Sequence, residues 1–337
     1  MKSFSDISET LTLQRILAPI LPQLELVEKK LQSISSDCEG LLKESSHYVL
    51  SSGGKRLRAA LVLFCCAIGS QEAKLDDSQL EKAVDLAVAV EMIHAATLVH
   101  DDVLDRSVLR RLRPTVNVQF GEEVAILLGD FLYTRAFPLL VSLNVPEILL
   151  WITHSTQEVC DGEISQLKNR YRLNLSQEEY LTFIRKKTAS LIAVSAKSGA
   201  RLGNLKTEQV QSLYNFGLHI GTTFQIVDDL LDVIGTEKNL GKTPHNDASN
   251  GKLTLPMILL LQQALPEEKQ QFKNLFESTD GDWTSIQNLL TKYRIAEKTD
   301  AIAAQFFAQA QSELKTFNSA TQTSFQELSR FILKRNY

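Results

Sequence analysis

Two short clusters of carboxylates dominate the chemistry that this 337-residue sequence can perform. Both follow the pattern Asp-Asp-x-x-Asp, formed first by Asp101, Asp102 and Asp105 and again by Asp228, Asp229 and Asp232. In a helix, the outer aspartates of each pattern lie four residues apart and therefore share a face. Paired carboxylate oxygens suit Mg²⁺, which takes one or two protein carboxylates and completes its shell with water and substrate phosphate. The two clusters therefore indicate magnesium sites that serve a phosphate substrate.

The alternative is that both clusters are solvated acidic helix ends. A like-charge pair one turn apart costs a helix about 0.2–0.5 kcal/mol, and the helix macrodipole further disfavours negative charge at a C-terminus. Each cluster ends a strongly apolar stretch, about 80–105 and 207–234, whose upstream face must be buried. The metal interpretation is favoured, because a bound dication reverses the sign of the repulsion.

Basic residues that can complete a phosphate site occur in three groups. The first is segment 53–58, Gly-Gly-Lys-Arg-Leu-Arg, in which Lys55 and Arg58 lie one turn apart. The second is the pair Arg110-Arg111, whose guanidinium groups suit phosphate oxygens. The third comprises Lys187-Thr188, Lys242 and Lys252. Each group alone is also typical of a solvated surface, so their significance comes from their combination with the two acidic clusters.

The elements that must position these residues are helices. The chain has only 15 Gly and 8 Pro, and its apolar residues recur every three or four positions, so we expect an all-α protein that needs no strands. No linker or low-complexity tract interrupts residues 1–337, which predicts a single domain. Helices are expected near 10–33, 38–51, 55–70, 80–105, 117–143, 145–170, 176–203, 207–234, 252–263, 283–294 and 296–335, with a loop at 241–251.

Composition excludes several classes of protein. With 36 Lys and Arg against 40 Asp and Glu, the chain lacks the basic excess of a nucleic-acid-binding protein. Its four cysteines, Cys38, Cys65, Cys66 and Cys160, fit neither a disulfide framework nor a metal pair and are expected to be buried thiols. The polar N-terminus does not resemble a secretory signal, and apolar runs such as 59–68 are too short to cross a bilayer. We therefore expect a cytoplasmic protein that contacts membranes at most peripherally.

Longer segments around these clusters resemble the trans-isoprenyl diphosphate synthase family. They are GGKRLR at 53–58, EMIHAATLVHDDVLDRSVLRRLRPTVN at 91–117, GDFLYTRAF at 129–137, KTASL at 187–191 and FQIVDDLLDVIG at 224–235. The similarity extends over about 53–256. The GDFLYTRAF segment and the small residues before the first aspartate cluster look most like the octaprenyl and solanesyl synthase branch.

This resemblance implies a bundle of antiparallel helices around a deep apolar cavity, and a homodimer. It implies that all six aspartates bind about three Mg²⁺ ions together with the allylic diphosphate, which Arg110 would clamp. By the same resemblance, the isopentenyl diphosphate site is expected to contain Lys55, Arg58, His94 and Arg111. The allylic diphosphate and the reacting carbon would be surrounded by Lys187, Thr188, Gln225, Lys242 and Lys252. A lone His94 is also compatible with a hydrogen-bonded core residue, although it shares a helical face with Asp101.

The reaction implied is the magnesium-dependent head-to-tail condensation of isopentenyl diphosphate onto an allylic diphosphate. A medium-length or long all-trans product is expected because Ala96 and Thr97 are small. The expected use of this product is as a quinone side chain. Ala96 and Thr97 lie about 5–8 Å before Asp101 along a helix, where short-chain members commonly carry an aromatic residue. The same small residues would also serve close helix packing. Two departures from the family are Leu112, where Gly is common, and GKTPHND at 241–247, where the family has a GKPxGxD loop.

Four other functions stay open on sequence alone. One is a short-chain farnesyl or geranylgeranyl diphosphate synthase. A class I terpene cyclase is disfavoured because such enzymes pair one aspartate motif with an Asn/Ser/Glu motif. A non-catalytic subunit of a heteromeric synthase often lacks one aspartate motif, whereas this chain retains both. A helical interaction protein with acidic patches would bind neither magnesium nor diphosphate.

Overall fold

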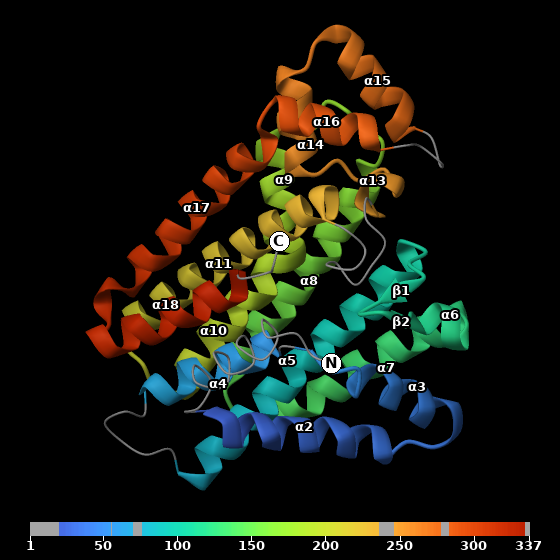
Figure 1. Ribbon diagram of the computed structural model, residues 1–337. Coiled ribbons are helices and arrows are strands. Elements are labelled where there is room, and N and C mark those ends of the chain that lie inside the picture. Colours follow the sequence, from blue (N-terminus) through green and yellow to red (C-terminus); the bar gives the residue numbers. More distant parts are fainter. Residues whose placement is uncertain (1–19, 55, 70–75, 236–245, 278–282, 334–337) are drawn as a thin grey trace, which may run out of the picture.

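The computed structural model describes residues 20–54, 56–69, 76–235, 246–277 and 283–333, and it confirms the all-α class (Figure 1). The α-helices are α2 (Leu21–Ser36), α3 (Gly40–Leu50), α4 (Leu57–Gly69), α5 (Asp77–Leu104), α6 (Val116–Phe120), α7 (Glu122–Ser142), α8 (Pro146–Lys168), α9 (Gln177–Ile184), α10 (Ser190–Leu202), α11 (Thr207–Ile234), α13 (Asn246–Ser249), α14 (Leu255–Gln263), α15 (Pro266–Phe276), α16 (Thr284–Lys292), α17 (Ile295–Glu313) and α18 (Ser319–Leu333). A π-helix η2 (Arg185–Ala189), a 3-10 helix η3 (Leu314–Thr316) and the two-residue strands β1 (Leu109–Arg110) and β2 (Arg113–Pro114) complete the regular structure of this part of the chain.

Several predicted elements need correction. The strand pair β1–β2 was not expected, and it forms because residues 109–114 double back through a two-residue turn. The helix predicted at 176–203 contains the π-helix η2, and the one predicted at 296–335 breaks at η3. Helix α15 was missed because its first half is polar after Pro266 and its apolar residues, Phe272, Leu275 and Phe276, lie only in its second half. Within the predicted loop 241–251, residues 246–249 form α13, while residues 241–245 lie outside the described part.

Helix α5 is the central helix of the core and carries the first acidic motif at its end. It starts with a capping box in which the backbone N–H of Gln79 donates to the Asp76 carboxylate at 2.7 Å. Every residue from Ala83 to Ile93 is buried, as expected of a helix that is apolar on all sides. The helix ends at Leu104, so its last turn presents Asp101 and Asp102 and is capped by Asp105.

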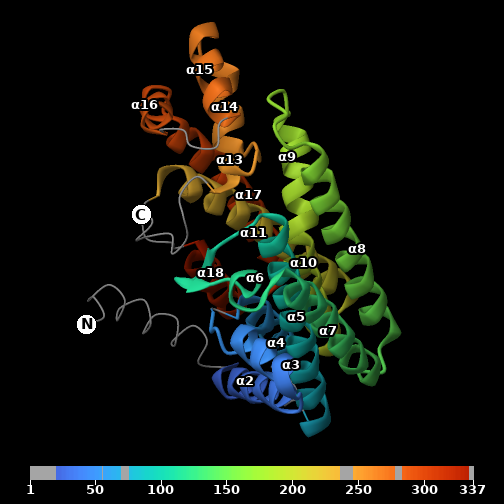
Figure 2. The ribbon, with the colours of Figure 1, turned by 90° about the vertical axis from the view of Figure 1, so that its right-hand side faces the viewer.

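Helices α5, α7, α8, α10 and α11 run side by side and form the body of the molecule (Figures 1 and 2). Small residues bring some of these helices unusually close. A Cβ atom at Gly217 or Gly221 of α11 would lie 2.7 Å from the Cα of Ala193 or Ala189, respectively. Contacts this short exclude any larger side chain, so glycine at these positions sets the distance of α11 from α10 and η2.

The second acidic motif lies where α11 joins two buried apolar clusters. Phe216 and Ile220 belong to the larger cluster, which includes α4, α5 and α7, whereas Ile226 and Val233 belong to a smaller cluster around α14 to α17. Figures 1 and 2 show α15 and α16 at the opposite end of the molecule from α2 and α3. Because α11 is anchored in both clusters, its aspartates have a fixed position relative to the body.

Helices α5 and α7 are both long and apolar enough to meet the criteria for a membrane span, which corrects the expectation that all apolar runs are too short. The apolar window of α5 is 72% buried inside the molecule, as in a core helix, whereas that of α7 is 33% buried. Helix α7 therefore exposes much apolar surface.

Candidate active site

The first acidic motif has its central aspartate turned into the protein. Asp102 is 3% exposed and is bound by Arg110. The Arg110 Nε lies 3.0 Å from Oδ1 and 2.8 Å from Oδ2 of Asp102, and its Nη2 lies 2.7 Å from Oδ1. Burial tends to lower the pKa of Arg110, but the Asp102 carboxylate outweighs burial and raises it. Arg110 is therefore a fixed cation beside Asp101 and Asp105.

The hairpin β1–β2 delivers Arg110 to this place. Arg111 and Leu112 form its turn with φ of 53° and 61°, the left-handed pair of a type I′ turn. Arg111 Nη1 donates to the carbonyl of Gly53, and a Cβ at Gly54 would lie 2.6 Å from Nη1. The turn thus packs against the double-glycine segment, which brings together two of the basic groups that the sequence singled out.

The outer aspartates of the first motif are paired with cations from other parts of the chain. Asp105 accepts a hydrogen bond from Arg170 Nη2 at 2.8 Å and another from Lys252 Nζ. Asp101 lies 3.6 Å from Lys187 Nζ, which also pairs with Glu163. The pincer that the sequence predicted, Asp101 and Asp105 on one face, is present and faces three basic side chains.

Lys187 is held between several acceptors at the π-helix η2. Its Nζ donates to Gln166 Oε1 at 3.1 Å as well as pairing with Glu163. A Cβ at Gly162 would lie 2.9 Å from the Lys187 backbone nitrogen, so glycine allows α8 to approach η2. Burial alone would lower the pKa of Lys187, but Asp101 and Glu163 raise it above its ordinary value. Lys187 is consequently a permanent cation.

The second acidic motif shows the same division between central and outer aspartates. Asp229 is 4% exposed and accepts hydrogen bonds from Tyr180 Oη and Gln225 Nε2, both at 2.7 Å. Gln225 Oε1 in turn accepts from the Thr188 hydroxyl at 2.7 Å. This chain of bonds fixes the orientation of Thr188 and Gln225, the two polar groups predicted to lie near the reacting carbon.

The outer aspartates of the second motif differ in exposure. Asp228 is partly exposed, whereas Asp232 is fully buried and accepts a hydrogen bond from the backbone N–H of Asp247 at 3.3 Å. The backbone N–H of Lys252 bonds to the carbonyl of Asp247 at 2.9 Å, and the Lys252 side chain reaches Asp105. Residues 247–252 therefore connect the two acidic motifs.

A second basic region surrounds His94. Burial, followed by the positive charges of Arg58, Arg110, Arg111 and Arg56, keeps the pKa of His94 well below its ordinary range. Burial likewise lowers the pKa of Arg58 to about 10, and its Nε has no hydrogen-bond partner among the described residues. A neutral imidazole beside several guanidinium groups is suited to bind a small polyanion.

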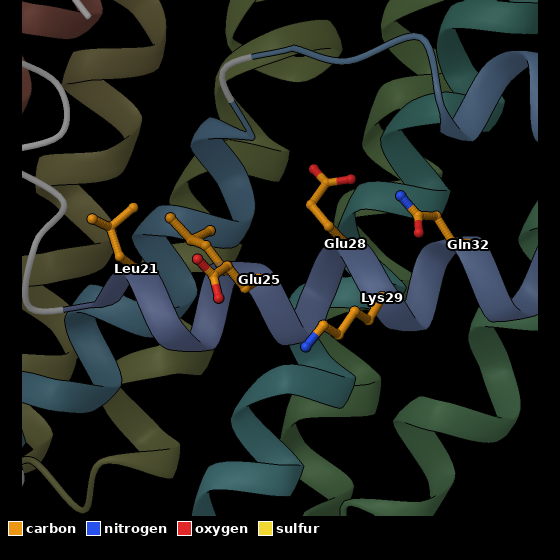
Figure 3. A pocket seen from close by; sticks show the side chains of 6 residues that line it. Leu21, Glu25, Glu28, Lys29 and Gln32 are labelled. Carbon is orange, nitrogen blue, oxygen red and sulfur yellow. The ribbon is translucent and has the colours of Figure 1, made fainter. Parts of the chain in front are cut away.

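Glu91 and Glu28 bind residues of this basic region. Glu91, 4% exposed, accepts from the backbone N–H of Ala59 in the first turn of α4 at 3.1 Å and lies 3.6 Å from Arg56. Arg56 also donates to Glu28 at 2.6 Å. Glu28 lines a surface hollow on α2 and projects from the opposite side of the helix to Lys29 (Figure 3). None of the aspartates of the two motifs lines that hollow.

The remaining predicted site residues fall into two groups. Lys55 and Lys242 lie outside the described residues. Ala96 is fully buried in the larger core cluster, and Thr97 is partly exposed with its hydroxyl bonded to the His94 carbonyl at 2.8 Å. Of the cysteines, Cys65 and Cys66 are buried as expected, but Cys38 is only half-buried and Cys160 is exposed.

Sequence reasoning missed the residues that support the site from other helices, because none belongs to a pattern of chemically similar neighbours. They are Glu28, Glu91, Glu163, Gln166, Arg170, Tyr180 and Asp247, whereas Arg56 belongs to the basic segment 53–58 but was assigned no role. Only Glu163 and Gln166 offered a sequence signal, because they lie one turn apart on α8. Such a pair of one acidic and one amide side chain is also common on protein surfaces.

The donor set of the site fits magnesium. Among the described residues, no group of three His, Cys, Asp or Glu side chains is gathered into a closed metal cage. Mg²⁺ does not require one, because it binds through one or two carboxylates and keeps water and substrate phosphate as its other ligands. Asp101 and Asp105, with side chains 22% and 12% exposed, offer such oxygens.

Comparison with known proteins agrees with this geometry. Residues 39–293 match the family model described as polyprenyl synthetase. The heptaprenyl diphosphate synthase component 2 of Bacillus subtilis is 33% identical over 317 residues, covering 93% of this chain and 88% of that protein. The short chain isoprenyl diphosphate synthase of Methanothermobacter thermautotrophicus is 32% identical over 321 residues, covering 93% and 96%.

Solved structures show the same fold. The polyprenyl synthase of Caulobacter crescentus CB15, complexed with calcium and isoprenyl diphosphate, superposes with a TM-score of 0.88 at 29% identity, covering 96% of this chain and 98% of that one. The family match spans well over half of the sequence, and both curated relatives are similar along most of their length. The chain therefore belongs to the polyprenyl synthetase family and is a prenyltransferase with the all-α isoprenoid synthase fold.

Proposed function

We propose that this protein is a magnesium-dependent polyprenyl diphosphate synthase that adds isopentenyl diphosphate head to tail onto an allylic diphosphate. The observation that carries the proposal is the convergence of Asp101, Asp105 and three basic side chains, Lys187, Arg170 and Lys252, at the end of α5. Membership of the prenyltransferase family supports it. The described residues thus offer separate partners for a metal ion and for a diphosphate.

The residues of the chain are suited to an electrophilic reaction. Magnesium ions bound through the outer aspartates supply charge stabilisation for the departing diphosphate. Lys187 and Arg110, both kept charged by neighbouring carboxylates, are suited to hold the negative charge on that group. The fixed hydroxyl of Thr188 and amide of Gln225 present oxygen dipoles beside the second motif, where they can stabilise an allylic cation.

The basic region around His94 is the proposed isopentenyl diphosphate site. Arg58 and Arg111 provide guanidinium groups, and His94, neutral at physiological pH, can donate a hydrogen bond to phosphate. Positioning two anions in separate basic regions on either side of the first motif places the reacting groups near each other. No nucleophilic side chain is needed for this chemistry.

We further propose that the product is longer than geranylgeranyl diphosphate and serves as a quinone side chain. The support is Ala96, which is fully buried one turn before Asp101 and carries no aromatic ring that would block a growing tail. A short-chain product is the competing outcome, and one relative of this chain carries a short-chain name.

One assay tests the activity and the product length together. Purified protein is incubated with labelled isopentenyl diphosphate, an allylic primer and Mg²⁺, and the products are sized by chromatography. We expect prenyl products beyond geranylgeranyl in the wild type and shorter ones in Ala96→Phe, with the first condensations preserved. Products that stop at farnesyl or geranylgeranyl in excess isopentenyl diphosphate would contradict the long-chain proposal, and no condensation at all would contradict the synthase.

A further inference from the structure

Arg170 lies immediately beyond α8 and outside both acidic motifs, yet it reaches a predicted metal ligand. Its Nη2 donates to Asp105 Oδ1 at 2.8 Å and to the carbonyl of Leu104 at 3.3 Å. Its Nε is buried and has no hydrogen-bond partner in the described part of the chain. The other oxygen of Asp105 accepts from Lys252. Both oxygens of one outer aspartate are therefore neutralised by cations.

The backbone holds Arg170 in this position. The next residue, Tyr171, has a left-handed φ of 60° and donates its N–H to the carbonyl of Gly251 at 2.7 Å. A Cβ at Gly251 would lie 2.7 Å from the Tyr171 ring, which also packs edge-on against Phe276 with ring centres 5.9 Å apart. Because Gly251 precedes Lys252, one backbone contact brings both cations to Asp105.

The charges around the first motif are balanced within the protein. Four carboxylates, Asp101, Asp102, Asp105 and Glu163, face four cations, Lys187, Arg110, Arg170 and Lys252. A divalent ion that takes the Asp105 carboxylate leaves the partly buried Arg170 and the buried Lys252 without their partner, which is costly. A diphosphate compensates that cost because a guanidinium group binds phosphate oxygens as well as it binds a carboxylate.

We propose that Arg170 is a diphosphate-binding residue that exchanges partners, pairing with Asp105 in this structure and transferring to the substrate diphosphate when a divalent ion takes that carboxylate. The inference rests on the proposed function and deepens it. Its consequence is reciprocal coupling: the metal weakens the Asp105 pair and favours diphosphate binding, and diphosphate favours metal binding to the same extent. In the absence of diphosphate, Arg170 therefore competes with the metal ion for Asp105. In the presence of diphosphate, Arg170 binds the diphosphate and so favours binding of the metal ion.

Isothermal titration calorimetry on Arg170→Gln separates these two effects. Protein stripped with EDTA is titrated with Mg²⁺ alone, and then with inorganic pyrophosphate at saturating Mg²⁺. We expect the variant to bind Mg²⁺ alone several-fold more tightly, because the competing cation is gone. Its affinity for magnesium pyrophosphate should fall on the order of tenfold, as expected for the loss of one charge-assisted hydrogen bond.

Arg172→Gln is the matched control, since Arg172 lies two residues away and binds Glu179 and Asn169 at 2.8 Å, away from the aspartates. It should change neither affinity. Opposite shifts of the two affinities in Arg170→Gln support the inference, whereas shifts in the same direction, or no shift in either, overturn it. If the wild type condenses its substrates but the two affinities of Arg170→Gln do not shift in opposite directions, only the role of Arg170 is refuted. A wild type that binds neither probe refutes the proposed function itself.

Discussion

Asp102 and Asp229 hold the same place in their two motifs, and each has both carboxylate oxygens bound by protein donors. Arg110 covers Asp102, while Tyr180 and Gln225 cover Asp229. Both central aspartates are almost fully buried, so they fix the orientation of Arg110 and Gln225. In the first motif, the outer aspartates Asp101 and Asp105 face the basic side chains. The repeated pattern therefore combines a central positioning aspartate with outer candidate metal ligands, of which Asp232 alone is fully buried.

The turn that carries Arg111 is strained by Leu112. This residue is 70% exposed and has a φ of 61°, which costs a side chain with a Cβ about 1–2 kcal/mol. We expect Leu112→Gly to raise the free energy of unfolding by about 1 kcal/mol in urea denaturation, after the greater unfolded-state entropy of glycine is subtracted. Leu112→Ala keeps the strain and should show no such gain. A loss of stability in Leu112→Gly would show that the leucine makes a compensating contact.

His94 should make folding stability depend on pH. Burial and the surrounding arginines depress its pKa in the folded state, so the unfolded chain binds its proton more tightly. Stability is therefore present above the unfolded pKa of about 6.5 and is lost as the pH falls below it, by up to about 1.4 kcal/mol per pH unit. The measurement is the free energy of unfolding between about pH 7 and 5. His94→Gln should flatten this part of the profile, and an unchanged slope would contradict the account.

The contact between α7 and α5 depends on Gly129, the first residue of the GDFLYTRAF segment. A Cβ there would lie 2.1 Å from Nε2 of His100, which precedes Asp101 and contacts the carbonyl of Ile126 at 3.0 Å. Gly129→Ala should displace the His100 ring, break its contact with the Ile126 carbonyl and cost about 1 kcal/mol of stability. The cost should be smaller in a His100→Ala background, as a double-mutant cycle would measure. Additive costs would show that His100 is not the obstructing group.

We propose that helix α7 supplies the contact surface of a homodimer. Ile126, Leu127, Phe137 and Val141 are 45%, 66%, 43% and 60% exposed, which leaves a broad apolar face uncovered. We expect light scattering to report a dimer at micromolar concentration. Replacing Leu127 and Val141 by Glu should produce monomers that retain helical circular dichroism. A wild-type monomer, or a dimer unaffected by these charges, would contradict this interface.

The sequence predicted the acidic pincers and the helices that carry them because both depend on local periodicity. Asp101 and Asp105 follow an apolar helix, and a helix places residues four apart on one face wherever it packs. The partners of these aspartates could not be predicted in the same way. Glu163 lies on α8 and Arg170 lies two residues beyond its end, and they reach Lys187 and Asp105 only through tertiary packing. Single charged residues on a helix give no pattern that separates them from an ordinary solvated surface.

The local irregularities were also beyond sequence reasoning. A type I′ turn is normally indicated by Asn or Gly, and Arg111-Leu112 carries neither. Residues 185–189, Arg-Lys-Lys-Thr-Ala, contain neither Gly nor Pro, so nothing in the sequence indicated that a π-helix presents Lys187 and Thr188. These features arise where the site needs a backbone that regular helices do not provide, and π-bulges are frequent at such places.

Condensation by Asp101→Asn and Asp228→Asn, compared with the wild type, tests the central claim most directly. Each change removes one carboxylate charge from an outer position while preserving side-chain size. We expect turnover of labelled isopentenyl diphosphate with an allylic primer to fall by several orders of magnitude, with helical circular dichroism unchanged. Asp37→Asn, at the exposed end of α2, should keep full activity. Activity of either outer-aspartate variant within about tenfold of the wild type would contradict the assignment of these residues as metal ligands.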